Sequence, residues 1–389
     1  MSLASAVCFI ACHGGAANDF VVQAKELTSK GHTVRVFATG PALKVFQDRN
    51  ISNVHEFSLE EEKEYGQIAR EIAKKCQKAA AVIMDVGHIF DVFLQEAFAE
   101  IAPGVMRIAY YDNHEPYVPG GYSAIASKVM LKAHRTLFAN ANLVNARIYE
   151  TPSKEVPLSQ DSKIGLGYYS LEPPQEIARK RENEQSQIRM EFFSQHNMID
   201  KGQKVFVYAG GNNETYFSEA LPACLEFFGD LSAKEDLSDV IFVLQQHPGA
   251  KAKNIDANLV TEWLKNNEKS GSCPKIIISD MDTDSALVLA DAMFYYQTSM
   301  GPKFVLAGIP TVQIGHECYE DILVKNKFCQ VVNSKDELSK ALQTLKENES
   351  KISSQVVEGK LGIHSDWSER LQKAVSVRLN ENQTGESSK

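Results

Sequence analysis

The sequence lacks several features that mark particular classes of protein. It has no Cys-x-x-Cys pair, and its seven cysteines are scattered singly along the chain. No uninterrupted apolar run approaches the roughly 20 residues that span a bilayer, and the first residues lack the basic stretch of a signal peptide. We therefore expect reduced thiols, a cytoplasmic protein and no membrane span, with peripheral membrane contact left open.

Positive charge is also scarce. Lysine and arginine total 41 against 50 acidic residues, a net charge of −9 that argues against a general nucleic-acid binder. Hydrophobic residues make up 43% of the chain and charged residues 23%, which is ordinary globular composition. At 389 residues the chain is longer than one hydrophobic core usually supports, so we expect two domains.

Strand and helix patterns alternate in both halves of the sequence, which predicts mainly parallel sheets with right-handed crossovers. The first half contains a helical pattern that ends at Lys30-Gly31, and two further helices are expected over 89–101 and 122–139. Prolines and a charged helix (175–195) mark a linker, and amphipathic segments at 335–347 and 365–379 close the chain. The predicted strands are 5–11, 34–38, 81–84 and 106–111, then 204–209, 239–245, 275–279, 292–296 and 310–314.

The expected fold is therefore α/β, with two Rossmann-like, doubly wound parallel-sheet domains facing a cleft. The predicted boundaries are 1–165 for the first domain, 166–203 for a linker and helix, and 204–364 for the second domain. Ligands of such sheets bind just past the carboxyl ends of the strands, so the residues at those positions are the candidates for a site.

Three candidates of the second half follow strands directly. Gly210-Gly211-Asn212 suits either a close backbone approach to a diphosphate or sugar, or a tight turn that needs positive φ. His247, before Pro248-Gly249, is either a donor to a phosphate or sugar hydroxyl, or part of an ordinary turn. Glu317 is either an acceptor for sugar hydroxyls or a solvated loop acid.

The segment Thr298-Ser299-Met300-Gly301 follows another strand and begins a helix that is expected to run to Gly308. Its hydroxyls either cap that helix or hold a phosphate, with the helix macrodipole in support. The spacing of the glycines favours a phosphate.

An acidic run at 280–284 favours a helix cap, by Asp282 or Thr283, over a metal site, and no metal is expected. Within this run, the backbone of Met281 is placed to read the edge of a nucleobase.

In the first half, His13 follows the opening strand and Asp85 follows strand 81–84. If these strands are neighbours, Asp85 would fix the imidazole tautomer and make His13 a general base toward a hydroxyl. The alternative is that His13 caps a loop and Asp85 caps helix 89–101. The loop at 111–117, with Asp112 and His114, has the composition of a sugar or acceptor site, or of an ordinary loop.

Three stretches together resemble the GT-B class of nucleotide-sugar glycosyltransferases and the related UDP-sugar 2-epimerases. The first is Ala11–Gly15 with the later Lys30-Gly31-His32-Thr33-Val34. The second runs from Ala290 through Thr298–Gly301 to Gly308-Ile309-Pro310. The third is the closing helix around Trp367–Leu379.

The resemblance implies an inverting, metal-independent transfer of a sugar from a nucleotide sugar, with UDP favoured, to an acceptor hydroxyl, and no bound cofactor. His13 and Asp85 would be catalytic, Met281 would lie at the base and Glu317 at the sugar, and the closing helix would pack back on the first domain. The alternatives are a non-hydrolysing UDP-sugar 2-epimerase and a noncatalytic nucleotide-sugar-binding protein, and the oligomeric state stays undetermined. Further donor-binding positions would be Gly210, Gly211, Asn212, His247, Thr298, Ser299, Met300 and Gly301, and acceptor-side positions Gly14, Gly15, Asp112 and His114.

Overall fold

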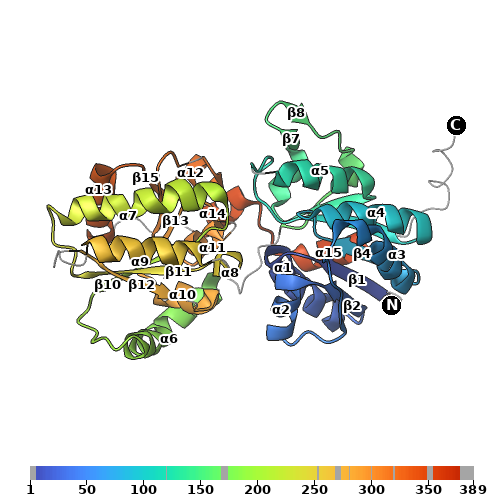
Figure 1. Ribbon diagram of the computed structural model, residues 1–389. Coiled ribbons are helices and arrows are strands. Elements are labelled where there is room, and N and C mark those ends of the chain that lie inside the picture. Colours follow the sequence, from blue (N-terminus) through green and yellow to red (C-terminus); the bar gives the residue numbers. More distant parts are fainter. Residues whose placement is uncertain are drawn as a thin grey trace. The chain divides into compact units, whose positions relative to one another are not determined.

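The computed structural model divides the chain into two compact units, Met1–Ser170 with Gly359–Lys389 (unit 1) and Leu171–Glu358 (unit 2) (Figure 1). Among the described residues no helix is both long and apolar enough to cross a membrane. All seven cysteines are free. The described residues are 6–119, 121–167, 174–251, 254–267, 273–279, 281–298, 300–318, 320–347 and 354–376.

Unit 1 contains a seven-stranded sheet in the order β3-β2-β1-β4-β5-β6-β9, and every pairing in it is parallel. The strand order reverses between β1 and β4, which is the point where ligands of open parallel sheets bind. The strands are β1 (Ala6–Ala11), β2 (Thr33–Ala38), β3 (Val54–Glu56), β4 (Ala81–Met84), β5 (Met106–Tyr111), β6 (Arg135–Phe138) and β9 (Lys163–Gly165).

Helices cover both faces of this sheet, which explains why its strands read as continuous apolar runs. Phe9 of β1 lies in a core with α1 (Gly14–Ser29), α2 (Gly40–Asp48) and α15 (Trp367–Ser376). Its neighbour Ile10 points to the other face, toward α3 (Tyr65–Cys76) and α4 (Ile89–Ile101). A third cluster joins the end of β5 to α5 (Tyr122–Lys132).

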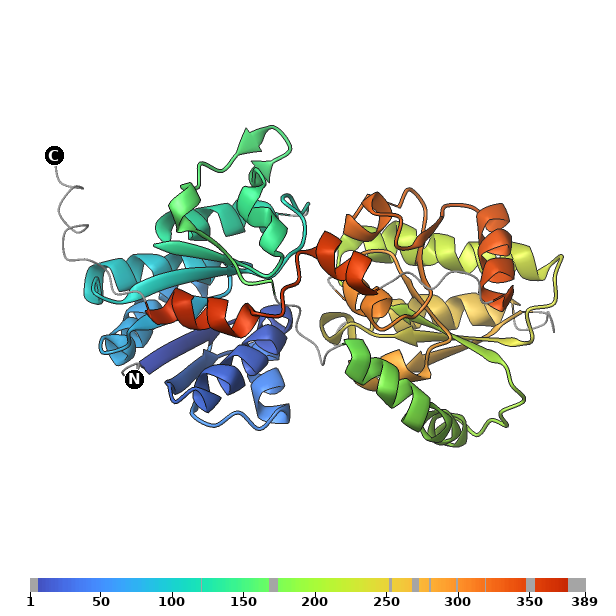
Figure 2. The ribbon, with the colours of Figure 1, turned by 180° about the vertical axis from the view of Figure 1, so that it is seen from behind.

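The helix α15 packs on unit 1, although it lies far from the rest of that unit in the sequence. Figure 2 shows it beside α1, and it also contacts β9. Leu371 and Val375 are buried in the core, Ser368 donates to Glu26 of α1, and Arg370 donates to the carbonyl oxygen of Gly165 at 3.2 Å.

Unit 2 repeats the topology with a six-stranded parallel sheet in the order β12-β11-β10-β13-β14-β15. Its core packs one sheet face against α7 (Leu221–Ser232), α9 (Ile255–Asn267) and α13 (Lys335–Glu347). On the other face, Arg181 of α6 (Pro174–Gln195) donates to the carbonyl oxygen of Ala290 at 2.8 Å, just past α10 (Thr283–Leu289) (Figure 1). The strands are β10 (Lys204–Ala209), β11 (Val240–Gln245), β12 (Lys275–Ser279), β13 (Ala292–Tyr295), β14 (Thr311–Ile314) and β15 (Gln330–Val332).

The predicted α/β fold class, with two parallel sheets, is confirmed. The predicted helix over 122–139 is wrong beyond Lys132, because Arg135–Phe138 forms β6 between β5 and β9. Leu137 and Phe138 are fully buried there, so the packing of the sheet outweighs the helical spacing. Elements for which no range was predicted include β3, β9 and β15, the hairpin β7 (Tyr149–Thr151) and β8 (Lys154–Glu155), and the helices α2, α3, α8 (Pro248–Lys251), α12 (Ile322–Lys325) and α14 (Ser354–Leu361).

Candidate functional site

His13 and Asp85 lie together where the strand order of unit 1 reverses. His13 comes two residues after β1, and Asp85 directly follows the neighbouring strand β4. The His13 Nδ1 atom lies 3.4 Å from Asp85 Oδ2, and the two side chains are 45% and 2% exposed. The same oxygen accepts the backbone N–H groups of Cys12 (2.9 Å) and His13 (3.1 Å). The Asp85 carboxylate therefore fixes both the turn after β1 and the imidazole ring of His13.

The electrostatics of this pair favour its charged form. Burial opposes ionisation of Asp85, yet the hydrogen bond and charge of His13 outweigh it and lower the pKa of Asp85 to about 2. Burial likewise opposes protonation of His13, but the hydrogen bond and charge of Asp85 and the charge of Asp112 together outweigh it and raise the pKa of His13. A carboxylate on Nδ1 leaves Nε2 of the neutral ring as the proton acceptor.

A glycine makes room for the imidazole ring. A Cβ atom on Gly87 would lie 3.1 Å from both Cε1 and Nδ1 of His13 and 3.3 Å from the ring of Tyr122. The Tyr122 hydroxyl donates to Asp112 Oδ1 at 2.6 Å, and a Cβ on Gly15 would lie 3.3 Å from Asp112 Oδ2. The residues that follow β1, β4 and β5 thus meet at one edge of the sheet.

The structure gives the surroundings of two other acceptor-side candidates, His114 and Gly14. His114 is buried, and burial lowers its pKa to about 3, so its ring is neutral at pH 7. A Cβ on Gly14 would meet Pro41 only at ordinary contact distance, so this glycine is not required by packing.

A second buried carboxyl, Asp91, joins the site and was absent from the prediction. It is 0% exposed, its Oδ2 atom accepts the His88 backbone N–H at 2.9 Å, and one of its oxygens lies within 4.8 Å of an oxygen of Asp85. His88 Nδ1 in turn accepts the N–H of Phe90 at 3.1 Å, which completes a capping box at the start of α4. The spacing His-x-x-Asp before an apolar run was the available sequence signal.

One atom from each of Cys12, Asp85 and Asp91 lies within 4.8 Å of the others, close enough for a metal ion. However, one oxygen of each carboxyl already accepts backbone hydrogen bonds. Burial also raises the pKa of the Cys12 thiol, which disfavours the thiolate that a metal requires. We therefore assign this group no metal.

In unit 2, Gly210 and Gly211 follow β10, and neither has a positive φ, so the expected turn geometry is not the reason for them. A Cβ on Gly210 would lie 2.7 Å from the carbonyl oxygen of Gln245, and one on Gly211 would lie 2.7 Å from the ring of Tyr216. Close packing therefore requires both glycines. Their predicted contact with a diphosphate stays a prediction, as does that of the exposed Asn212 beside them.

The Thr298 segment follows β13, and Thr298 Oγ1 accepts the N–H of Met300 at 3.1 Å. The helix α11 (Gly301–Leu306) is shorter than expected, and Met300, which precedes it, gives no side-chain cap. A Cβ on Gly301 would lie 2.9 Å from Leu323 Cδ1, so this glycine is also set by packing. Ser299 lies outside the described residues.

The backbone groups of Met281, another donor-side candidate, already make hydrogen bonds. The carbonyl oxygen of Met281 accepts from Gln245 at 3.2 Å and its N–H donates to the Ser279 hydroxyl at 3.2 Å, so reading a base would require exchanging these bonds. Asp282 caps α10 through the N–H of Ser285 at 3.0 Å, which confirms the expected cap.

The last two donor-side candidates are exposed. Glu317 has φ of 51° and a side chain that is 83% exposed. His247, past the end of β11, is exposed as well.

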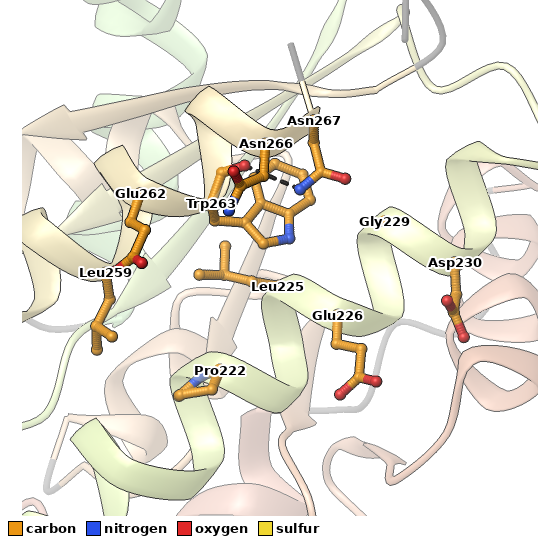
Figure 3. A pocket seen from close by; sticks show the side chains of 10 residues that line it. All are labelled: Pro222, Leu225, Glu226, Gly229, Asp230, Leu259, Glu262, Trp263, Asn266 and Asn267. Carbon is orange, nitrogen blue, oxygen red and sulfur yellow. Dashed lines mark hydrogen bonds between the residues drawn. The ribbon is translucent and has the colours of Figure 1, made fainter. Parts of the chain in front are cut away.

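The hollow in Figure 3 lies between α7 and α9 of unit 2, with a volume of about 470 Å³. Leu225 and the indole of Trp263 line it between the acidic side chains of Glu226 and Glu262. None of its lining residues is a predicted site residue. We therefore place the candidate site at the strand ends, where the ionisable side chains gather.

Comparison with known proteins supports the fold. No family model matches the chain, and no curated protein matches it by sequence. A glycosyltransferase from Rickettsia africae is 11% identical with a TM-score of 0.67, over 99% of this chain and 100% of that one. The UDP-GlcNAc 2-epimerase from Methanocaldococcus jannaschii is 13% identical with a TM-score of 0.66, over 95% of this chain and 99% of that one.

A third solved structure, the UDP-GlcNAc 2-epimerase from Neisseria meningitidis bound to UDP-GlcNAc, is 11% identical with a TM-score of 0.65, over 95% of this chain and 99% of that one. The chain thus has the two-unit α/β fold that GT-B glycosyltransferases share with UDP-GlcNAc 2-epimerases, as the sequence resemblance predicted. The likeness at this identity concerns the fold.

Proposed function

We propose that this protein is a glycosyltransferase that moves a sugar from a nucleotide sugar to an acceptor hydroxyl, with inversion and without a metal. The observation that carries the proposal is the His13–Asp85 pair, 3.4 Å apart where the strand order of unit 1 reverses. An exposed imidazole on a buried, ionised carboxylate is a general base with a fixed tautomer.

The chemistry follows from which ring nitrogen is free. With Asp85 3.4 Å from Nδ1, the proton of the neutral His13 ring is assigned to Nδ1, and Nε2 takes the proton of the acceptor hydroxyl. The hydroxyl oxygen forms a bond to the anomeric carbon as the bond from that carbon to the diphosphate breaks, and the diphosphate leaves with the electron pair. Asp85 stabilises the imidazolium that forms. General base catalysis of this kind contributes about 10²–10⁴-fold in rate.

The strand ends of unit 2 are proposed to hold the donor. They present hydroxyl, amide and backbone N–H groups, as in Thr298 and Asn212, which suit hydrogen bonds to a diphosphate. A UDP-type donor is supported by solved structures of the same fold, since one is a complex of a Staphylococcus aureus protein with UDP and another holds UDP-GlcNAc. On the acceptor side, Asp112 and His114 follow β5.

The test has two stages. A thermal-shift screen over UDP, GDP, CMP and dTDP sugars finds the donor, because a ligand that binds only the native state raises its stability. His13→Ala is then expected to lose about 10²–10⁴-fold in transfer with donor binding retained and with no effect of a chelator on the wild type. His55→Gln, on the exposed edge strand β3, is the matched control and should transfer normally. Unchanged transfer by His13→Ala would refute the assignment of the base.

A 2-epimerase is the second candidate, because the carboxyl groups of Asp85 and Asp112 both act on the imidazole of His13, and Asp91 lies within 4.8 Å of Asp85. Incubation with a UDP sugar alone separates the two, since an epimerase interconverts sugars without an acceptor. If no nucleotide or nucleotide sugar protects the protein in the thermal screen, a noncatalytic role replaces both.

A further inference from the structure

Beneath His13 lie two carboxyl groups that are both removed from water. Asp85 is 2% exposed and Asp91 0%, and one oxygen of each lies within 4.8 Å of the other. Two ionised carboxylates this close repel one another strongly at low dielectric, and a proton on one of them removes the repulsion and allows a hydrogen bond. Among the described residues, the ion pair recorded for this cluster is the single one between Asp85 and His13. One charge of the two is therefore uncompensated unless a proton is held.

The hydrogen bonds show where that proton belongs. Asp85 Oδ2 already accepts two backbone N–H groups and faces the imidazole of His13. Asp85 Oδ1 is buried, and among the described residues no N–H or O–H group donates to it. Asp91 accepts the His88 N–H on Oδ2 and becomes the missing donor once it carries a proton.

We propose that Asp91 is held as a neutral carboxylic acid that donates a hydrogen bond to Asp85 and so positions that carboxylate toward His13. Asp91 is a positioning residue, since it acts on the imidazole through Asp85. Its importance for turnover rests on the proposed function, but its protonation does not.

The surroundings agree with one negative charge in this buried pair. Burial raises the pKa of Asp91 well above its ordinary value, and the charge of Asp85 raises it further. On the neighbouring elements, burial raises the pKa of the Cys12 thiol and lowers that of His88, so both are neutral at pH 7. Across β5, Asp112 faces His13 and is hydrogen-bonded to Tyr122.

The first experiment is an NMR titration of the His13 ring in the full chain without substrate. Asn has the size of Asp and keeps an N–H donor but carries no charge. If Asp91 is neutral, Asp91→Asn leaves the pKa of His13 within about 0.3 of the wild-type value. Asp85→Asn, the positive control, lowers it by about one or more because the paired charge is lost. A comparable fall in Asp91→Asn would mean that Asp91 is ionised and would overturn the proposal.

The second experiment covers the case in which Asp91→Asn does not fold. Infrared spectra of the wild type at pH 7, far above the ordinary aspartate pKa of about 3.9, should contain the C=O stretch of a protonated carboxylic acid. Absence of that band in the wild type refutes the proposal. Where the variant folds, it should lose a band that Asp112→Asn keeps, and zinc should leave the band in place. Loss of the band with stoichiometric zinc would show a metal site instead. Failure of glycosyl transfer leaves each of these readouts unchanged.

Discussion

The two sheets have the same topology, but the residues past their strands differ in kind. At the strand ends of unit 1 the polar groups are ionisable and buried, with Asp85 and Asp91 almost inaccessible beside His13. At the strand ends of unit 2 amide groups pair with one another, as Asn213 with Gln297 at 2.6 Å, and the buried carboxylates accept from neutral groups, as Asp256 from Gln246 at 2.8 Å.

This difference separates two tasks that the same architecture can serve. Burial and charge partners shift pKa values, which proton transfer requires. Binding a diphosphate requires fixed N–H and O–H donors, and these work without any ionisable group. Each prediction below changes a residue at the strand ends of one sheet and asks whether the strand ends of the other sheet are unaffected.

The largest effect is expected from Asp85→Asn, because it removes the partner that raises the pKa of His13. We expect kcat/KM for transfer to fall by about 10²–10⁴-fold with donor affinity retained. His13 acts as a base only when unprotonated, so activity should rise with pH through its raised pKa. In the variant that pKa is lower and the rise should move to lower pH. A pH profile of kcat/KM measures both effects, and an unmoved rise would contradict the pairing.

The next effect concerns stability in unit 2. Gly210→Ala puts a methyl group 2.7 Å from the carbonyl oxygen of Gln245, a backbone atom that cannot move cheaply. We expect a loss of about 1–3 kcal/mol in the free energy of unfolding, measured in urea. Gly104→Ala is the control, since its Cβ meets nothing within 4 Å and its φ is not positive. Equal stability of the two variants would show that packing does not require the glycine after β10.

A smaller effect is expected from Gly87→Ala. The added Cβ lies 3.1 Å from two atoms of the His13 ring, so the ring must shift by a few tenths of an ångström. Because proton transfer depends on position, transfer should fall about tenfold while donor binding in unit 2 is unchanged. Steady-state kinetics with a parallel thermal-shift titration of the donor test this. A change in donor affinity without a change in the rate of transfer would show that the substitution does not act through the His13 ring.

The smallest effect is expected from Thr298→Val, which keeps the shape of the side chain and removes the hydroxyl that accepts from Met300. Loss of one neutral hydrogen bond is worth about 1 kcal/mol, so donor affinity should weaken about fivefold. The pKa of His13 should stay at its wild-type value. Calorimetry measures the donor affinity, and the NMR titration measures the pKa of His13. Unchanged donor affinity would mean that Thr298 is not part of the donor site.

Local patterns accounted for most of the elements. The apolar runs over 106–111 and 275–279 became β5 and β12, and the segment 335–347 became α13, because their periodicity is a property of neighbouring residues. Arg135–Phe138 failed as a helix because its burial between β5 and β9 depends on strands distant in sequence. The cap by Asp282 was readable, since donor and acceptor are three residues apart.

The sequence by itself determined the alternation of strands and helices, the glycines after the strands and the presence of His13 and Asp85 at strand ends. Only the tertiary structure decided that these two meet across 72 residues of chain, since adjacency of β1 and β4 is a choice of sheet order that no local pattern encodes. It also decided that Asp91 is buried beside Asp85. Burial and charge, which set the acidity of a carboxyl group, are properties of the packed fold.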